Sequence, residues 1–274
     1  MSPHDASSEA STAQDSAVEP WAEAILRFID YGIEVDALIE MHLSGLGHAK
    51  KFPQLLEITN PTPDALTIAR RRADIALKIE VSGSHLMYAH CLLGLWSALE
   101  AMVEDLAGAW MKAVPEVLER AAFSKVRIPL AEFTRLSEDD RIRLLISEAQ
   151  RDLRTELASG VTRFERLLEA VGLDGAVDAD VRKTIFEMWQ SRNILAHRAG
   201  ICDRKFTDSC PWLDYQPGDK LRIDAERFER YNQALMSYSL ALFNRCRKHF
   251  NLSLIEAAAP VPSVPNQAER NSHR

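Results

Sequence analysis

The sequence predicts an all-α fold, and three observations lead to this prediction. Hydrophobic residues make up 46% of the 274 residues, which is enough for a sizeable core. Only 11 glycines and 12 prolines occur, and a fold of many β-strands needs more turn residues than that. Apolar residues recur every three or four positions along most of the chain, which is the helical period. The one exception that we expect is a short β-hairpin, with residues 221–223 pairing with residues 212–215.

The two ends of the chain differ in composition from the rest. Residues 1–19 are rich in serine, alanine and acids, and residues 259–274 contain three prolines among small and polar residues. We expect both to be disordered tails. About 240 residues remain, enough for one large domain or two small ones in close contact. We expect residues 20–81 to form N-terminal helices that are packed on, or part of, a helical bundle built by residues 82–258.

No targeting or membrane-spanning segment is expected. Residues 1–19 contain no apolar run and therefore do not resemble a signal peptide. No segment approaches the roughly 18 consecutive apolar residues of a membrane span. The sequence thus predicts a soluble cytoplasmic protein with no membrane partner.

The first helix should begin near Trp21 and end by the glycines at positions 45 and 47. A proline-containing connector, residues 53–63, follows it. The second helix should cover residues 64–81. The next segment, residues 85–113, is the longest amphipathic stretch of the chain, because its apolar residues step by three and four along one face.

The helices of the second half are bounded by local signals. Ser137 is a good N-cap and Asp140 follows three residues later, a variant of the capping box. The helix that they start should run over residues 142–157 and be broken at Gly160. Another helix should cover residues 161–171.

Two longer helices should complete the bundle. Asp178 or Asp180 should cap the first of them, which runs to about Ala199 and stops at Gly200. The last helix should run over residues 224–250.

Charge and cysteine content restrict the function. The formal net charge of −7 argues against a non-specific nucleic-acid binder, although a local basic site remains compatible with it. The four cysteines match neither a zinc pattern nor a CxxC redox motif, so we interpret them as reduced structural thiols.

Two charged residues fall where apolar residues are expected. Arg192 lies within an apolar stripe of the helix before Gly200, and Glu100 lies within the stripe of the long helix 85–113. An unpaired buried charge is unfavourable by several kcal/mol or more. We therefore predict that Glu100 approaches Arg192 in space. The alternative is that each side chain extends separately to water.

Arg192 also begins a motif. Asn193 follows it, His197 completes an Arg-x4-His pair, and Gly200 comes three residues later at the end of a helix. In the form Arg192-Asn193-Ile-Leu-Ala-His197-Arg-Ala-Gly200, this segment resembles the HEPN superfamily of helical nucleotide-associated domains. The resemblance extends to an acid, Glu100, in the long helix, and covers residues 85–250.

The resemblance implies a bundle of four or five helices that usually forms a homodimer, with two Arg-x4-His motifs in a shared cleft. Catalytic members of the superfamily are metal-independent ribonucleases, and many serve as toxins or in defence against phage. It therefore also implies RNA as substrate and an antitoxin protein as a possible partner, with no cofactor. Other members have lost activity and act as binding or scaffolding modules.

The chemistry of RNA cleavage suits these residue types. Without a metal, the 2′-hydroxyl of RNA attacks the adjacent phosphate, which needs a base, an acid and positive charge. His197 can exchange protons near neutral pH, Arg192 can hold phosphate oxygens in a fork, and Asn193 can hold a phosphate oxygen or orient the histidine. A more modest interpretation is that His197 only caps the end of its helix.

Further cations could contact RNA beside the motif. Arg198, Arg204 and Lys205 would supply local positive potential to an acidic protein. The alternative for Arg198 is a solvated surface residue.

Two hypotheses follow: a metal-independent endoribonuclease, or a non-catalytic module that binds RNA, nucleotide or a protein partner. The intact Arg, Asn and His favour the first, and the net acidity favours the second. A helical metalloenzyme fits poorly, because no Glu-x-x-His pattern occurs on any expected helix.

Overall fold

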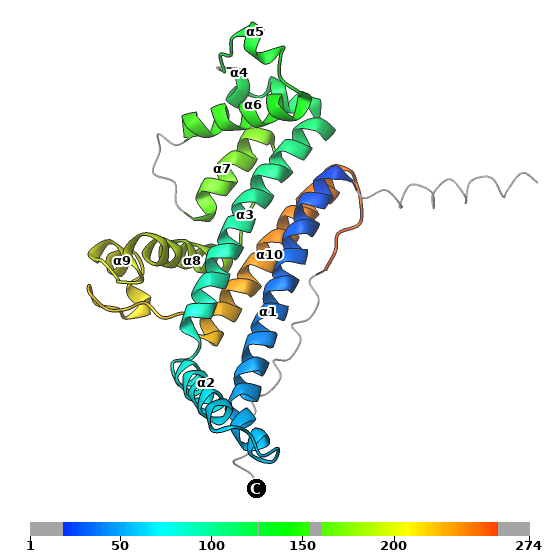
Figure 1. Cartoon of the computed structure of the whole chain (residues 1–274). Coiled ribbons are helices and arrows are strands. Elements are labelled where there is room, and N and C mark those ends of the chain that lie inside the picture. The colour runs from blue at the N-terminus through cyan, green and yellow to red at the C-terminus, as the bar shows by residue number, and fades with distance from the viewer. Residues whose placement is uncertain (1–18, 125, 154–159, 257–274) are drawn as a thin grey trace, which may run out of the picture.

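The computed structural model describes residues 19–124, 126–153 and 160–256, and this part of the chain is all-α, as predicted (Figure 1). Apart from Glu19, the two expected tails lie outside the described residues. Its α-helices are α1 (Pro20–Glu57), α2 (Pro63–Val81), α3 (His85–Ala113), α4 (Ala121–Ser124), α5 (Leu130–Phe133), α6 (Glu138–Leu153), α7 (Val161–Val171), α8 (Ala179–Arg198), α9 (Arg204–Ser209) and α10 (Ala225–His249). Two 3-10 turns, Pro115–Glu119 and Pro211–Leu213, complete the regular structure.

Helix α3 is the centre of the bundle. Helices α1, α6, α7, α8 and α10 all pack against it. Its buried face carries the apolar stripe that the sequence predicts, with Trp96, Leu99, Val103 and Trp110 almost completely buried. Among the described helices α3 alone is long and apolar enough to cross a membrane, but half of its most apolar window is buried inside the bundle. The core helix of a soluble protein has the same properties.

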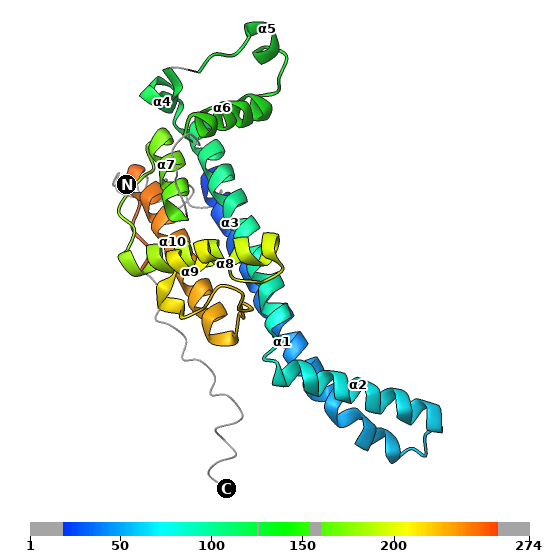
Figure 2. The same cartoon turned by 90° about the vertical axis from the view of Figure 1, so that its left-hand side faces the viewer.

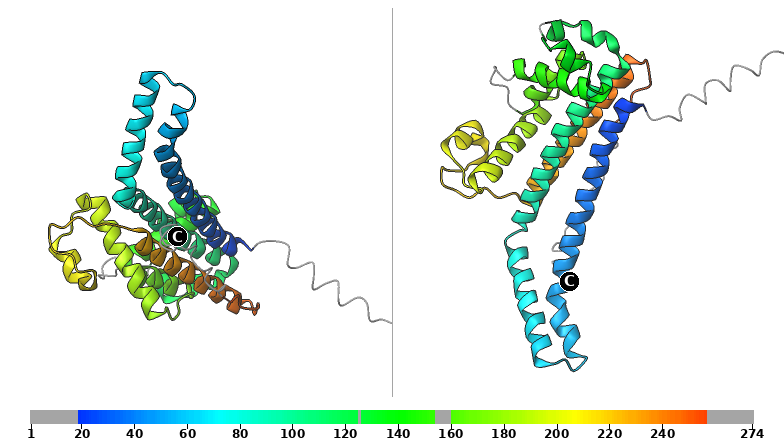
Figure 3. Two further views of the ribbon diagram at one scale, coloured as in Figure 1. Left: turned by 90° about the horizontal axis from the view of Figure 1, so that it is seen from below. Right: turned by 45° about the horizontal axis from the view of Figure 1, so that its top comes forward.

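Helix α1 is much longer than predicted, because it does not end at Gly45 or Gly47. It continues through Pro53, which is buried, and ends at Glu57. Packing against α2 supports this distal part, so tertiary contacts override the weak helix preference of glycine. Thr62 then caps α2 by accepting a hydrogen bond from the backbone N–H of Ala65 at 3.3 Å. Figures 2 and 3 show that the α1–α2 hairpin extends well beyond the bundle.

Most helix ends in the second half agree with the local signals. Ser137 Oγ accepts a hydrogen bond from the backbone N–H of Asp140 at 3.2 Å and donates one to its carboxylate at 2.6 Å. Helix α7 has the predicted bounds and closes at Gly172. Asp178, rather than Asp180, caps α8. The predicted end of the helix before Gly160 lies outside the described residues.

The predicted β-hairpin is wrong. The described chain has no strand, and its one isolated β-bridge joins Ile201 to Lys220. Residues 211–213 form a 3-10 turn in place of the expected strand, and Asp214 ends that turn with a left-handed φ of 53°. The segment instead folds back onto the end of α8, where the backbone N–H of Leu221 donates to the Gly200 carbonyl at 2.7 Å.

A buried carboxylate fixes α8 against α10. The Glu187 side chain is fully buried, and its two oxygens accept hydrogen bonds from Arg230, Trp212 and Tyr231. The Tyr231 hydroxyl also bonds to Ser191 at 3.1 Å. This network orients the helix that carries Arg192 and His197.

Candidate functional site

Arg192, Asn193 and His197 come together in the last turns of α8. Arg192 Nη1 donates to Asn193 Oδ1 at 3.2 Å and is also 3.2 Å from His197 Nε2. A guanidinium has no acceptor, so this contact is a hydrogen bond in the tautomer that leaves Nε2 free to accept. Arg192 and Asn193 are half-buried, whereas the His197 ring is exposed. The geometry therefore places Nε2 of the exposed His197 ring beside a permanent cation.

The backbone at the end of α8 explains why His197 is exposed. Ala199 and Gly200 both adopt the left-handed conformation, with φ angles of 51° and 82°. The N–H groups of Ala199 and Gly200 both donate to the Ile194 carbonyl, the second at 3.1 Å, and these bonds close the helix. His197 thus lies on the final turn, at the surface.

The predicted contact between Glu100 and Arg192 is wrong. Glu100 instead accepts a hydrogen bond from Arg163 of α7 at 3.0 Å. The cause is the orientation of α8, whose buried face also includes the polar residues Glu187, Gln190 and Ser191. The apolar residues alone had indicated a different face, so Arg192 lies at the edge of the core rather than within it. Glu100 therefore does not support the motif through a direct contact.

The other predicted cations lie on and after the end of α8. Arg198 Nε lies 3.5 Å from Asp203 Oδ2, an ion pair that partly neutralises it. Asp203 also caps α9 by accepting the backbone N–H of Phe206 at 2.9 Å. Arg204 and Lys205 are exposed in the first turn of α9 and have no ion-pair partner among the described residues. Residues 198–209 thus carry three cations and two acids, Asp203 and Asp208.

A cavity of about 410 Å³ adjoins the end of α8, and no sequence pattern predicts it. Leu195, Ala199 and Gly200 contribute to its wall, opposite the first turns of α3. Residues 220–222 close a third side, and this segment reaches α8 only because the chain folds back there. The polar residues around the cavity are Ser82, His85, His90, Lys220 and Arg222.

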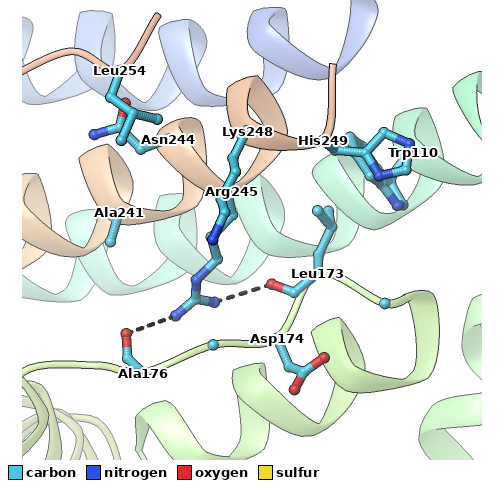
Figure 4. Close-up of a pocket in the computed structure, with 12 residues that line it drawn as sticks. Trp110, Leu173, Asp174, Ala176, Ala241, Asn244, Arg245, Lys248, His249 and Leu254 are labelled. Carbon is cyan, nitrogen blue, oxygen red and sulfur yellow. Dashed lines mark hydrogen bonds between the residues drawn. The ribbon is translucent and has the colours of Figure 1, made fainter. Parts of the chain in front are cut away.

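A larger cavity, of about 600 Å³, lies between α10 and the α7–α8 connection (Figure 4). Arg245 extends across it and donates to the carbonyls of Leu173 at 3.1 Å and Ala176 at 3.2 Å. Its guanidinium also pairs with Glu165 at 3.0 Å. Because all these partners belong to the protein, Arg245 holds the connection in place and is not available to a ligand.

The four cysteine thiols are unreactive. All four are buried and free of disulfides. Burial raises the pKa of the Cys210 and Cys246 thiols to about 12, so neither forms the reactive thiolate near neutral pH. The described residues contain no group of three or more His, Cys, Asp or Glu side chains placed to hold a metal ion.

Comparison with known proteins adds no relative. No protein family matches the chain, and no curated protein or solved structure resembles it significantly. What the fold and site define is an all-α protein with an Arg-Asn-His cluster at an exposed helix end.

Proposed function

We propose that this protein is a metal-independent endoribonuclease of the HEPN type. The observation that carries the proposal is the hydrogen-bonded cluster of Arg192, Asn193 and His197. A histidine that only capped its helix would point its ring nitrogen at backbone carbonyls. The Nε2 atom of His197 instead faces a guanidinium at 3.2 Å, and this contact supports a role as general base.

The reaction would use these groups as follows. A bound phosphate attracts the Arg192 guanidinium, which releases His197 Nε2. Nε2 takes the proton of the RNA 2′-hydroxyl, and the 2′-oxygen forms a bond to phosphorus as the bond to the 5′-oxygen breaks. Arg192 and Asn193 stabilise the charge on the phosphorane. In the shared cleft that the resemblance implies, a protonated His197 from a second copy gives the proton to the leaving 5′-oxygen.

The surroundings of the cluster suit an RNA strand. Arg198, Arg204 and Lys205 would attract the backbone on either side of the scissile phosphate. The cavity beside Leu195 is large enough for one base, and its apolar walls would contact the ring. A role as a toxin or in phage defence, held in check by an antitoxin, follows from the resemblance alone.

The test is RNA cleavage in excess chelator by the wild type and by Arg192→Ala and His197→Ala. Arg182→Ala is the matched control, since Arg182 is an exposed arginine of the same helix. We expect a product ending in a 2′,3′-cyclic phosphate, with activity about 10²- to 10⁴-fold lower in the His197 variant. The control should keep wild-type activity. Far-UV circular dichroism verifies that every variant is folded.

Equal residual activity in wild type and variants, over several classes of RNA, would refute the ribonuclease. The alternative, a non-catalytic module, would then be tested by RNA binding. Arg192→Ala should weaken the binding of such a module while leaving RNA uncut.

A further inference from the structure

The distal end of the α1–α2 hairpin exposes large apolar side chains on both helices. In the last turns of α1, Phe52 is 47% exposed and Leu55 61%, and Ile58, just past the helix end, is 82% exposed. On α2, Ile68 is 54% exposed and Ile75 47%. We call these five residues the hairpin patch. Contiguous exposed apolar residues are typical of a surface that contacts a protein or a membrane.

Two ion pairs fix how the helices of the hairpin lie side by side. They join Lys50 to Glu80 and Glu57 to Arg70. Because α1 and α2 run antiparallel, these pairs put Ile75 level with the turn of α1 that carries Phe52 and Leu55, and Ile68 level with the end of α1. The apolar residues of the two helices are therefore neighbours along the hairpin.

The same ion pairs show that the patch lies on one face of the hairpin. At about 100° per residue, Phe52 and Leu55 are each roughly 140° or more around α1 from the bridging residue Glu57. On α2, the two isoleucines of the patch lie at a similar angle from Arg70, its partner. Charges thus bridge one face of the hairpin and apolar residues line the other, which Ile58 extends to the tip.

Exposed cations lie beside the patch. Arg71 and Arg72 follow Ile68 by three and four residues, so both are one turn from it on the exposed side of α2. Lys51 precedes Leu55 by four residues, which places it one turn away on the same side of α1. None of the three cations forms an ion pair with another described residue. The patch is therefore apolar in the middle and positively charged around it.

The distal hairpin is basic, in contrast to the chain as a whole. Residues 48–82 carry six lysines and arginines and four acids, whereas the net charge of the whole chain is −7. Two of these cations and two of these acids pair with each other. Four cations and two acids then have no ion-pair partner in this part of the described chain. A surface that complements the hairpin must accept apolar side chains and carry negative charge.

We propose that the hairpin patch binds to the surface of a membrane that contains anionic lipids. The five apolar side chains insert between the lipid headgroups, and the three cations contact the lipid phosphates. Such contact needs no membrane-spanning segment. The hairpin extends well beyond the bundle (Figure 2), so a flat surface can reach its distal end. It also projects away from α8 and α9, and the proposal does not rest on the proposed ribonuclease activity.

The size and composition of the patch favour a membrane over a macromolecular partner. The patch is about 15 Å long at a helical rise of about 1.5 Å per residue, and about 20 Å wide across two helices. A protein seated on it would bury roughly 600 Å² over both partners, less than the ~1,000 Å² of a specific protein interface. RNA bases stack on aromatic rings, and Phe52 is the one ring of the patch. A few inserted apolar side chains and nearby cations are sufficient for a membrane surface.

The first experiment measures flotation of the full chain with lipid vesicles. One set of vesicles is phosphatidylcholine alone, and the other contains about 30 mol% of the anionic lipid phosphatidylglycerol. We expect binding to the anionic set, much weaker binding to the neutral set, and loss of binding at about 0.5 M salt. No binding to anionic vesicles overturns the proposal and leaves a protein as the partner of the patch. Equal binding to both sets overturns it as well, because the cations would then have no role.

A charge variant tests whether the cations of the patch act locally. Arg71→Ala/Arg72→Ala should weaken binding to anionic vesicles about 25-fold, at about fivefold per charge. Arg135→Ala/Arg182→Ala is the matched control, since it removes two exposed arginines of the bundle and changes the net charge equally. The control should bind like the wild type. Equal weakening in both double variants would show that net charge alone governs binding, which refutes a site at the patch.

An apolar variant tests the other half of the patch. Leu55→Glu should weaken binding by about tenfold or more, because it removes an inserted side chain and adds a negative charge. Leu43→Glu is the matched control: Leu43 is 45% exposed on the side of α1 that carries the ion pairs, one heptad before Lys50. Both leucines are exposed, and circular dichroism verifies that both variants are folded. Binding by Leu55→Glu at the level of the control contradicts the proposal.

Tryptophan fluorescence reports insertion directly. Phe52→Trp should shift its emission to shorter wavelength when anionic vesicles are added, because the new indole enters an apolar environment. The wild type, with its own five tryptophans, supplies the background, and Leu43→Trp should show no such shift. Vesicle binding without a shift in Phe52→Trp would refute insertion of the patch.

Discussion

Replacing Glu187 by glutamine would remove a negative charge from the interior of the bundle at almost constant volume. The Glu187 carboxylate accepts four hydrogen bonds: two from Arg230, one from Trp212 at 2.7 Å and one from Tyr231 at 2.8 Å. A glutamine amide has a single acceptor oxygen, so about half of these donors lose their acceptor.

The magnitude follows from which donors can reach water. A hydrogen bond to a buried charged group contributes about 1.5 to 3 kcal/mol, and an unsatisfied buried donor adds about 1 to 3 kcal/mol. The Arg230 side chain and Trp212 are both partly exposed, at 44% and 41%, and can turn toward solvent, whereas Tyr231 is buried. We therefore expect Glu187→Gln to lower the free energy of unfolding by about 3 kcal/mol at pH 7. Ser191→Ala, which removes only the bond to Tyr231, should lower it by about 1 kcal/mol.

The free energy of unfolding that Glu187→Gln loses should depend on pH in a defined direction. Burial raises the pKa of the Glu187 carboxyl, but hydrogen bonds from Arg230, Trp212 and Tyr231 outweigh this and hold it below its ordinary value of 4.5. A depressed pKa gives stability that is present above the unfolded value and is lost as the pH falls through the folded value. The difference between wild type and Glu187→Gln should therefore shrink as the pH falls below 4.5.

Urea denaturation followed by circular dichroism at several pH values measures both quantities. A loss below about 1 kcal/mol at pH 7 would show that water or neighbouring groups satisfy the stranded donors. If the difference in free energy of unfolding between wild type and Glu187→Gln stays constant below pH 4.5, the hydrogen bonds are not the cause of the depressed pKa of Glu187.

Two further predictions concern helices. Gly47→Ala should raise the free energy of unfolding by about 0.5 to 1 kcal/mol, because the new methyl group meets open space and alanine favours the helix; a decrease in a urea titration would contradict the described course of α1. Asp178→Ala should lower the stability by about 1 kcal/mol, since its carboxylate accepts the backbone N–H groups of Asp180 and Val181. Asp178→Asn should retain most of that stability, and equal losses in both variants would count against a capping role.

The parts of the fold that could be predicted from sequence are those specified by near neighbours. The ends of α7 and the capping of α6 by Ser137 follow from residues within one helical turn. The length of α1 could not be found in this way, because its distal half is helical through contacts with α2. Gly45 and Gly47 indicate an end only if no such contact exists.

The candidate site shows a second limit. The residues of the motif are close together because they share one helix, so their proximity was predictable. The orientation of α8 was not, because Glu187 is buried by partners 25 and 43 residues further along the chain. A buried face assigned from the apolar residues alone leaves out the side of α8 on which Glu187 is buried. Because of this wrong face, the sequence analysis predicted that Arg192 lies in the core and contacts Glu100.

Helix α1 belongs to two structural units at once. Its first half, with Trp21, Ile25 and Phe28, is locked into the bundle, while its second half is supported by α2 alone beyond the bundle. The distal half can therefore open locally, with α2, without global unfolding. Helix α8 is held by α3, α7 and α10. The surface of the hairpin can thus diverge during evolution and acquire or lose partners, while the geometry of the Arg-Asn-His cluster stays unchanged.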